Sequence, residues 1–253
     1  MPRFSANLGF LWTELTLPDA IRRAKAAGFE AVEMHWPYET PDEEIAAALE
    51  ETGLPLLGVN TVRGDTAKGD NGLAAVPGRE EQARAGILQA VDYAHAVEAG
   101  AIHVMAGKNG DEETFIANLR FAAEEARDVG KTILIEPLNS RDAPDYFLTE
   151  VEQAAEIIIR TGAANIRIMF DAYHVQIMQG DLTRRLEAIL PFVGHIQFAA
   201  VPSRAEPDEG EVCYERFLRA VDEMGWSGFV GAEYKPRGTT DEGLGWMKAF
   251  ASN

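Results

Sequence analysis

The chain has 253 residues, 46% hydrophobic and 25% charged, a composition typical of a globular enzyme with one large or two small domains. Lys and Arg total 23 against 41 Asp and Glu, and the net charge of -18 makes nucleic acid and anionic membranes poor candidate partners. The one cysteine, Cys213, excludes an intrachain disulfide and a cysteine-built zinc cluster. No apolar run is long enough for a signal peptide or a membrane span, so we expect a cytoplasmic protein.

Short apolar runs alternate with helical patterns along the chain. Strands are predicted at 5–11, 31–36, 55–60, 101–107, 132–138, 166–174, 194–200 and 228–235. Helices are predicted at 18–28, 41–53, 78–100, 111–130, 149–162, 181–190 and 214–225. Two of these segments, 18–28 and 41–53, open on proline and close on glycine, the usual asymmetry of helix ends.

Eight strands alternating with helices over this length predict a single (β/α)8 TIM barrel of the α/β class. The alternative, a doubly wound open sheet, has fewer strands and often a glycine-rich phosphate loop, which this sequence lacks. Composition does not change along the chain, so residues 1–253 are interpreted as one domain. Residues 61–78 form a long irregular segment after the third strand, either a lid over the site or a surface loop.

Four oxygen-bearing side chains lie at or near the carboxyl ends of the last four predicted strands: Glu136, Asp171, Gln197 and Glu233. In a barrel these strand ends form the catalytic face, so the four side chains should converge. Three carboxylates cannot crowd together without a compensating cation. Because all the ligands are oxygens, the sequence predicts a hard divalent ion, Mg²⁺ or Mn²⁺.

The segments ANLGFLWTEL, EMHWPY, LIEPLN, MFDAYHVQIMQGD, HIQFAAVPSRAEPDEGEV and GAEYKPRG resemble the hydroxypyruvate isomerase family, within the xylose isomerase-like barrel superfamily. The match spans nearly the whole chain. The resemblance implies Glu136, Asp171, Gln197 and Glu233 as metal ligands, with Glu136 and Glu233 also transferring the proton. Related epimerases commonly carry histidine where this chain has Gln197, and some family members isomerise longer 2-oxo acids.

The implied reaction interconverts hydroxypyruvate and tartronate semialdehyde (2-hydroxy-3-oxopropanoate), or a related 2-oxo sugar acid, through a cis-enediolate. A divalent metal stabilises the enediolate as a Lewis acid, and two carboxylates on opposite sides of the substrate remove and return the proton. The pathway would be carbohydrate or glyoxylate metabolism. No redox cofactor is required.

Histidines supply further candidates. Related epimerases place a substrate-binding histidine at the spacing of His174 from Asp171. His35 and His103 lie in predicted strands and would line the pocket or pack in the core, whereas His195 is interpreted as structural. Asn60, Asn139 and Asp142 are weaker candidates on position alone.

An anionic substrate needs a cation for its carboxylate. Four basic residues follow predicted strand ends, and one or two of them should bind substrate: Arg63, Lys108, Arg204 and Lys235. Trp12 and Trp36 form either an apolar wall of the pocket or part of the helix packing.

Three other functions remain as alternatives: a C3 epimerase of ketoses on the same metal site, an apurinic-site endonuclease, and a sugar-acid-binding protein without catalysis. The acidic net charge disfavours the endonuclease, and the pair of catalytic carboxylates disfavours the simple binder. The expected partner is a small hydroxy-keto acid, and a homo-oligomer remains open.

Overall fold

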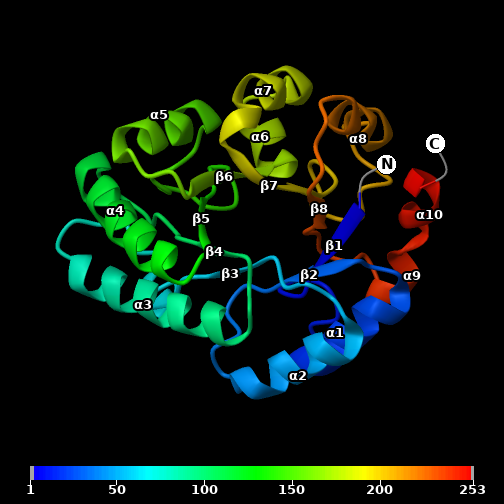
Figure 1. Cartoon of the computed structure of the whole chain (residues 1–253). Helices are drawn as coiled ribbons and strands as arrows, with labels where there is room; N and C mark the ends of the chain where they lie inside the picture. Colours follow the sequence, from blue (N-terminus) through cyan, green and yellow to red (C-terminus); the bar gives the residue numbers. More distant parts are fainter. Residues whose placement is uncertain (1–2, 252–253) are drawn as a thin grey trace.

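The computed structural model describes residues 3–251, in which eight parallel strands surround a central axis and helices lie outside them (Figure 1). The four terminal residues of the predicted 1–253 domain fall outside this range. The strands are β1 (Arg3–Asn7), β2 (Ala31–Glu33), β3 (Gly58–Asn60), β4 (Ala101–His103), β5 (Thr132–Ile135), β6 (Ile166–Asp171), β7 (Val193–Phe198) and β8 (Phe229–Ala232). The predicted (β/α)8 barrel is confirmed.

The sheet runs in the order β2-β1-β8-β7-β6-β5-β4-β3, which leaves one seam between β2 and β3. A single parallel bridge joins Val32 to Leu56 at this seam. Beyond it, the N–H of Met34 donates to the carbonyl of Gly58 over 3.0 Å, and the N–H of Asn60 donates to the carbonyl of His35 over 2.8 Å. These bonds nearly close the barrel.

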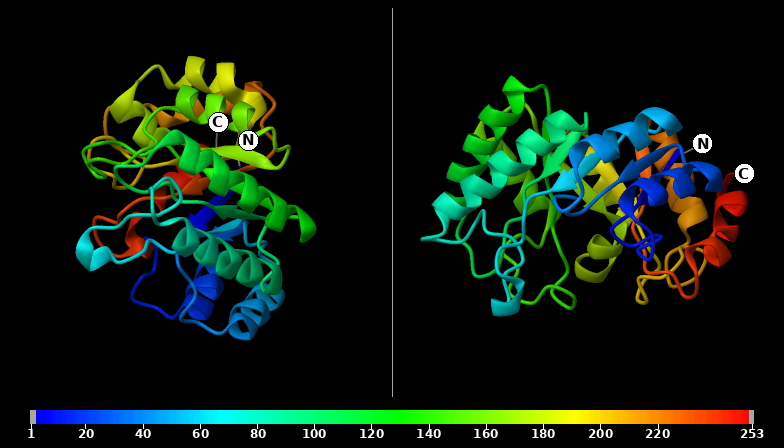
Figure 2. Two further views of the ribbon diagram at one scale, coloured as in Figure 1. Left: turned by 90° about the vertical axis from the view of Figure 1, so that its left-hand side faces the viewer. Right: turned by 90° about the horizontal axis from the view of Figure 1, so that it is seen from below.

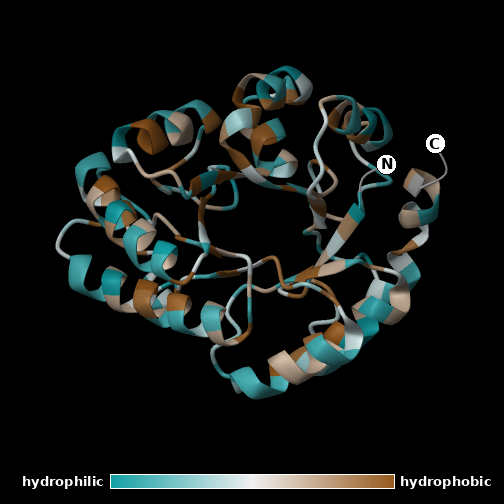
Figure 3. Ribbon diagram, in the orientation of Figure 1, coloured by the Kyte–Doolittle hydropathy of each residue, from teal (hydrophilic) through white to brown (hydrophobic). Residues whose placement is uncertain are grey.

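Seven helices occupy the segments predicted from the sequence: α1 (Leu17–Ala27), α2 (Asp42–Thr52), α3 (Glu80–Ala96), α4 (Glu112–Asp128), α5 (Val151–Thr161), α7 (Leu182–Ile189) and α8 (Tyr214–Glu223). Five short helices were not predicted: η1 (Thr66–Lys68), α6 (Ala172–Met178), η2 (Leu190–Phe192), α9 (Thr240–Gly243) and α10 (Gly245–Ala251). The long helices carry both hydrophilic and hydrophobic residues (Figure 3), as expected for helices with one face on the barrel.

The α1 helix shows how the sequence sets these boundaries. The Thr16 side chain caps its N-terminus by accepting the backbone N–H of Asp19, and proline occupies the first turn. Gly28 ends the helix in the left-handed conformation at φ 96°, where a side chain would be strained. Ile21 and Ala24 face the core and are fully buried.

The strands are shorter than predicted, for different local reasons. The predicted strand 166–174 ends at Asp171 because helix α6 begins at Ala172, whereas the backbone beyond β4 bonds to side chains. The N–H of Met105 donates to Thr61 Oγ1, and that of Ala106 donates to Tyr146 Oη. β4 therefore ends at His103, although apolar residues continue to Ala106. The loops after β3, β5 and β7 project on the same side of the barrel (Figure 2, right), so residues that follow these strands share one face.

The 61–78 segment divides into two parts. Gly64 to Gly69 are exposed and include η1. Leu73, Ala74 and Ala75 are buried, and the N–H of Ala75 donates to the carbonyl of Ala106 over 2.7 Å. Only the first part is therefore exposed along its length, as either a lid or a surface loop would be.

Candidate active site

The four predicted ligands lie at matching levels of the barrel. Asp171 is the last residue of β6 and pairs in register with Gln197 of β7, which in turn pairs with Gly231 of β8. Glu136 and Glu233 follow directly after β5 and β8. All four ligand candidates are buried, with at most 6% of each residue exposed.

Each of these side chains has one buried oxygen without a hydrogen-bond partner among the described residues: Glu136 Oε1, Asp171 Oδ2, Gln197 Oε1 and Glu233 Oε2. In three of them the second polar atom is bonded elsewhere. Asp171 Oδ1 accepts the N–H of Tyr173, and Gln197 Nε2 donates to Glu33. Four unsatisfied buried oxygens are costly in a protein interior, and a divalent cation is the group that would satisfy them. The donor set thus fits Mg²⁺ or Mn²⁺.

Two of the carboxyl groups also have strongly raised pKa values. Burial raises the pKa of Glu136 well above its usual range, and the charges of Glu233 and Asp171 raise it further. Burial and the Glu233 charge likewise raise the pKa of Asp171 to about 7, although the nearby Arg204 guanidinium lowers it. The protein alone therefore does not compensate the negative charge collected here.

His174 lies beside Glu136 and Asp171, and ligand atoms of these three residues lie within 4.8 Å of one another. Its Nδ1 accepts the backbone N–H of Asn139 over 2.9 Å. Burial lowers the pKa of His174 well below its usual value, so the ring is neutral and its one proton is on Nε2. An Nε2–H group is a hydrogen-bond donor and not a metal ligand. This tautomer favours the substrate-binding role over membership of the metal cluster.

The other two candidate histidines contact the predicted proton-transfer residues. His35 Nε2 lies 2.8 Å from Glu233 Oε1, and His103 Nδ1 lies 3.6 Å from Glu136 Oε2. Burial lowers the pKa of His103 to about 4, so this ring is neutral. Each predicted catalytic glutamate thus has a histidine of its own beside it.

Of the four candidate cations, only Arg204 reaches the carboxylates. Its Nη2 lies 3.5 Å from Glu233 Oε2 and 3.8 Å from Asp171 Oδ2, and its guanidinium group lies against the rings of Phe10 and Tyr173. Its backbone is left-handed at φ 56°, a strained conformation for arginine. Hydrogen bonds from its N–H to Ala200 and from the N–H of Lys235 to its carbonyl hold it there.

The remaining predicted residues lie further out. Arg63 stacks on the half-buried Trp36, 3.9 Å from the ring centre. Lys108 is half-buried, and its backbone forms an isolated antiparallel β-bridge with Tyr146. Lys235 is exposed. Trp12 is buried and its indole N–H donates to Asp241 at the start of α9, so it belongs to the helix packing.

Three weaker candidates also have defined places. The Asn139 amide contacts His174 Nδ1 and Asp142 Oδ2, and Asp142 also accepts the Tyr173 hydroxyl over 2.7 Å. Asn60 lines the barrel cavity described below, and its carbonyl accepts the Tyr38 hydroxyl.

One acidic residue of the site was missed by the sequence analysis. Glu33, the last residue of β2, is 5% exposed and accepts hydrogen bonds from Ser5 and Gln197, both over 2.7 Å. His195 Nε2 lies 2.9 Å from its Oε1. Burial favours a raised pKa, but the His195 charge and the bonds from His195, Ser5 and Gln197 lower the pKa of Glu33 below its usual value. His195 therefore lies against a buried carboxylate inside the barrel. This contact is consistent with the structural role that the sequence analysis gave it.

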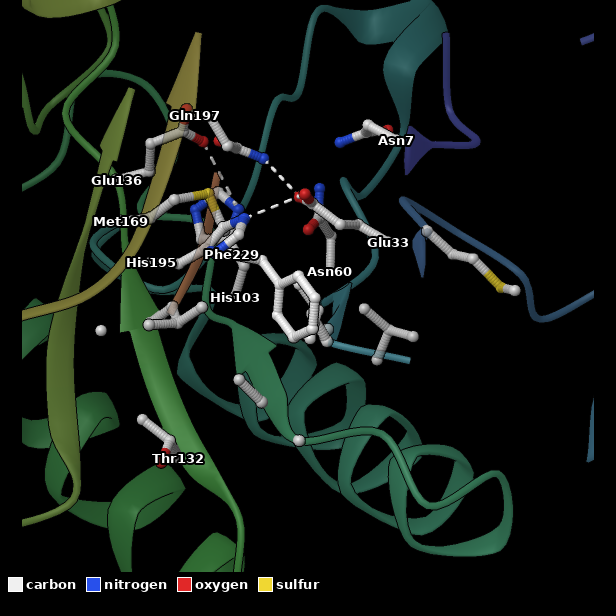
Figure 4. Close-up of a pocket in the computed structure, with 18 of the residues that line it drawn as sticks. Asn7, Glu33, Asn60, His103, Thr132, Glu136, Met169, His195, Gln197 and Phe229 are labelled. Carbon is white, nitrogen blue, oxygen red and sulfur yellow. Dashed lines mark hydrogen bonds and ion pairs between the residues drawn. The ribbon is translucent and has the colours of Figure 1, made fainter. Parts of the chain in front are cut away.

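A cavity of about 400 Å³ lies inside the barrel, on the amino-terminal side of Glu136 and Glu233. It extends from Thr132 and Gly194, at the amino ends of their strands, to Glu136 and Glu233 (Figure 4). Gly58 and Gly194 are among the residues that line it. The Glu33 and Gln197 side chains face one another across its upper part (Figure 4).

Comparison with known proteins places this geometry in a family. The model of the xylose isomerase-like TIM barrel family matches residues 21–250. The chain is 43% identical to 2-oxo-tetronate isomerase of Cupriavidus necator, over 99% of both chains, and 37% identical to hydroxypyruvate isomerase of Escherichia coli, over 99% of this chain and 100% of the relative.

Among solved structures, one described as an AP endonuclease of family 2 from Brucella melitensis superposes with a TM-score of 0.95 at 40% identity, over 98% of this chain and 99% of the other. The family match and the full-length relatives agree with the resemblance carried by the sequence motifs. The chain belongs to the xylose isomerase-like TIM-barrel family and, within it, to the hydroxypyruvate isomerase family.

Proposed function

We propose that this protein is a divalent-metal-dependent isomerase that interconverts hydroxypyruvate and 2-hydroxy-3-oxopropanoate, or the corresponding forms of a closely related 2-oxo sugar acid. The family membership supports an isomerase acting on hydroxy-keto acids. The observation that carries the metal dependence is the set of four buried, unpartnered oxygens on Glu136, Asp171, Gln197 and Glu233.

In this proposal the four oxygens hold Mg²⁺ or Mn²⁺, which when bound supplies Lewis-acid stabilisation of the negative charge on the enediolate. Glu136 and Glu233 come from opposite sides of the β6–β7 pair. One removes a proton from the substrate carbon, and the other, in its protonated form, donates a proton to the neighbouring carbon, while the hydroxyl proton moves to the former carbonyl oxygen. The His174 Nε2–H group donates to a substrate oxygen, and its Nδ1 is held by Asn139. Arg204 binds the substrate carboxylate from above the cluster.

The anionic substrate distinguishes this function from the ketose epimerase. An arginine that is 13% exposed and faces three carboxyl groups suits a substrate with its own carboxylate, whereas a neutral ketose has no group to pair with it. The endonuclease alternative requires binding to a phosphate backbone, which the net charge of -18 opposes.

A coupled assay tests the proposal. The purified protein is treated with EDTA, and formation of 2-hydroxy-3-oxopropanoate from hydroxypyruvate is followed with a specific reductase and NADH. We expect turnover only after Mg²⁺ or Mn²⁺ is restored, and 2-oxo-tetronate tested in parallel would identify the preferred chain length. Absence of turnover with both acids in the presence of metal would refute the proposed function.

A further inference from the structure

A group of buried polar side chains from three strands is centred on Glu33, which contacts Gln197. Ser5 of β1, Glu33 of β2 and His195 of β7 are all buried, and the two oxygens of Glu33 divide their contacts. Oε1 accepts the Ser5 hydroxyl and faces His195, whereas Oε2 accepts Gln197 Nε2 over 2.7 Å. These contacts leave Gln197 Oε1 without a partner among the residues described.

The bond to Glu33 determines which way the Gln197 amide points. An ionised carboxylate only accepts hydrogen bonds, so it must face the NH₂ end of an amide. In Figure 4 the amide nitrogen of Gln197 points to Glu33, while its oxygen lies on the side of Glu136. A neutral partner at position 33 would present both donor and acceptor atoms and would allow either orientation.

Packing alone does not fix this amide, because both Glu33 and Gln197 line the cavity. The neighbouring strand β8 leaves space for the carboxylate at Gly231. A Cβ atom at Gly231 would lie 2.1 Å from Glu33 Oε1 and 2.9 Å from Gln197 Cγ. The backbone of Gly231 does not require glycine, since its φ lies outside the left-handed region, so the missing side chain serves to leave space for these two groups.

We propose that Glu33 is a positioning residue, supported by Ser5 and His195, which holds the Gln197 amide so that Oε1 is presented to the divalent metal. This inference rests on the metal site of the proposed function. Only one of the two amide ends is a ligand, so glutamine requires a partner that fixes its orientation, and Glu33 is that partner.

The test is a double-mutant cycle read by metal affinity in the absence of substrate. Dissociation constants for Mn²⁺ are measured by electron paramagnetic resonance titration of the metal-free wild-type protein, Glu33→Gln, Gln197→Glu and the double variant. We expect Glu33→Gln to weaken Mn²⁺ binding on the order of 10–100-fold, as for other residues that orient metal ligands. A glutamate at position 197 has two equivalent oxygens and needs no orientation, so Glu33→Gln in that background should leave Mn²⁺ affinity unchanged or improved.

The double-mutant cycle distinguishes an effect of Glu33 on the orientation of the Gln197 amide from an effect of its negative charge on Mn²⁺ affinity. If Glu33 attracted the metal only through its negative charge, Glu33→Gln would weaken binding equally in both backgrounds, and the inference would be overturned. Glu206→Gln is the matched control, because it removes another buried carboxylate, bonded to Arg237. Its Mn²⁺ affinity should equal that of the wild type, and thermal unfolding of each metal-free variant confirms folding.

Two negative outcomes have different meanings. Failure of the wild-type protein to bind Mn²⁺ would overturn the proposed metal site itself, and the inference with it. Normal Mn²⁺ binding by both the wild type and Glu33→Gln would overturn the positioning role alone and leave the proposed function intact.

Discussion

His35 Nε2 lies 2.8 Å from Glu233 Oε1, so this histidine donates to the carboxylate and determines which oxygen remains free to face the site. The free oxygen, Oε2, is the one that lies 3.5 Å from Arg204. The close approach depends on Gly9, where a Cβ atom would lie 2.1 Å from His35 Nδ1. His35 therefore acts on Glu233 as well as lining the cavity.

Replacing His35 by phenylalanine removes this donor and keeps an aromatic ring. We expect kcat to fall by roughly 10²-fold, because a misoriented catalytic group reacts slowly, whereas KM should change little. His95→Phe, on the exposed side of α3, is the control and should retain full activity. A rise in KM without a change in kcat would instead assign His35 to substrate binding.

The proton-transfer pair gives the second prediction. Glu136→Gln and Glu233→Gln each retain an oxygen ligand and nearly the same shape but lose the base. We expect kcat to fall by about 10²–10⁴-fold in either variant, while Mn²⁺ still binds. In deuterated water the wild-type product should carry deuterium at the accepting carbon, measured by mass spectrometry. Full activity in both variants with metal bound would show that another residue transfers the proton, and His174 would be the next candidate.

Much of the barrel could be predicted because each strand carries its own local signal. All eight strands lie within or close to the predicted segments, and the largest error is at their carboxyl ends. There the sequence stays apolar, but local contacts end the strands. The N–H groups beyond β4 bond to the Thr61 and Tyr146 side chains, and helix α6 begins directly after β6. A period-two pattern cannot distinguish these residues from strand residues.

The contacts of Glu33 with Ser5, His195 and Gln197 could not be predicted from the sequence. Glu33 ends a buried strand just as Asp171 does, so the rule that selected the other acids applied to it as well. Its partners identify its role, and Gln197 is 164 residues away in the chain. The choice of Arg204 among four cations likewise depended on a left-handed backbone conformation that no local pattern indicated.

Arg204 and Lys235 provide a matched pair for testing carboxylate recognition. Arg204, after β7, faces the buried cluster, whereas Lys235, after β8, is exposed although both follow strand ends on the same face of the barrel. We expect Arg204→Gln to raise KM for hydroxypyruvate on the order of 10–100-fold, the loss of a charge-assisted contact of about 1.5–3 kcal/mol. Lys235→Gln should leave KM unchanged. Equal KM values for both variants would remove Arg204 from substrate binding.

The raised pKa values predict how pH changes the stability of the metal-free protein. The pKa of Asp171 is about 7 in the folded state against an ordinary 3.8, so the folded state holds this proton more tightly than the unfolded state. This stabilisation is complete below about pH 4 and is lost as pH rises through 7, by at most about 1.4 kcal/mol per unit of pKa displacement. The pKa of Glu136 is raised as well and adds to the same trend.

Thermal unfolding in EDTA should therefore show Tm falling between pH 5 and pH 8, by about 2–4 °C for each kcal/mol lost. Mg²⁺ or Mn²⁺ should flatten the curve, because the cation offsets the ionised carboxylates. Asp171→Asn should reduce the slope in EDTA, since the amide does not titrate. A flat Tm profile of the metal-free wild type over this range would contradict the uncompensated charge of the cluster.

The last prediction concerns the proposed lid within the 61–78 segment. Its exposed part, residues 64–69, lies between two anchors: Arg63, which stacks on Trp36, and Asp70, which forms a 3.0 Å ion pair with Arg79. The following residues, Leu73 to Ala75, are buried, and the N–H groups of Ala74 and Ala75 donate to the loop after β4. Closure should therefore be a local motion of residues 64–69 about these fixed ends.

Hydrogen exchange followed by mass spectrometry can resolve the two parts. Without ligand, amides of residues 64–69 should exchange much faster than those of residues 73–75, because residues 64–69 are exposed, whereas residues 73–75 are buried and the N–H groups of Ala74 and Ala75 donate to the loop after β4. Addition of metal and tartronate, a non-isomerisable analogue of the substrate, should slow exchange in residues 64–69 and leave residues 73–75 as they were. Equal exchange of residues 64–69 with and without the analogue, while the cluster is shown to bind it, would identify this segment as an ordinary surface loop.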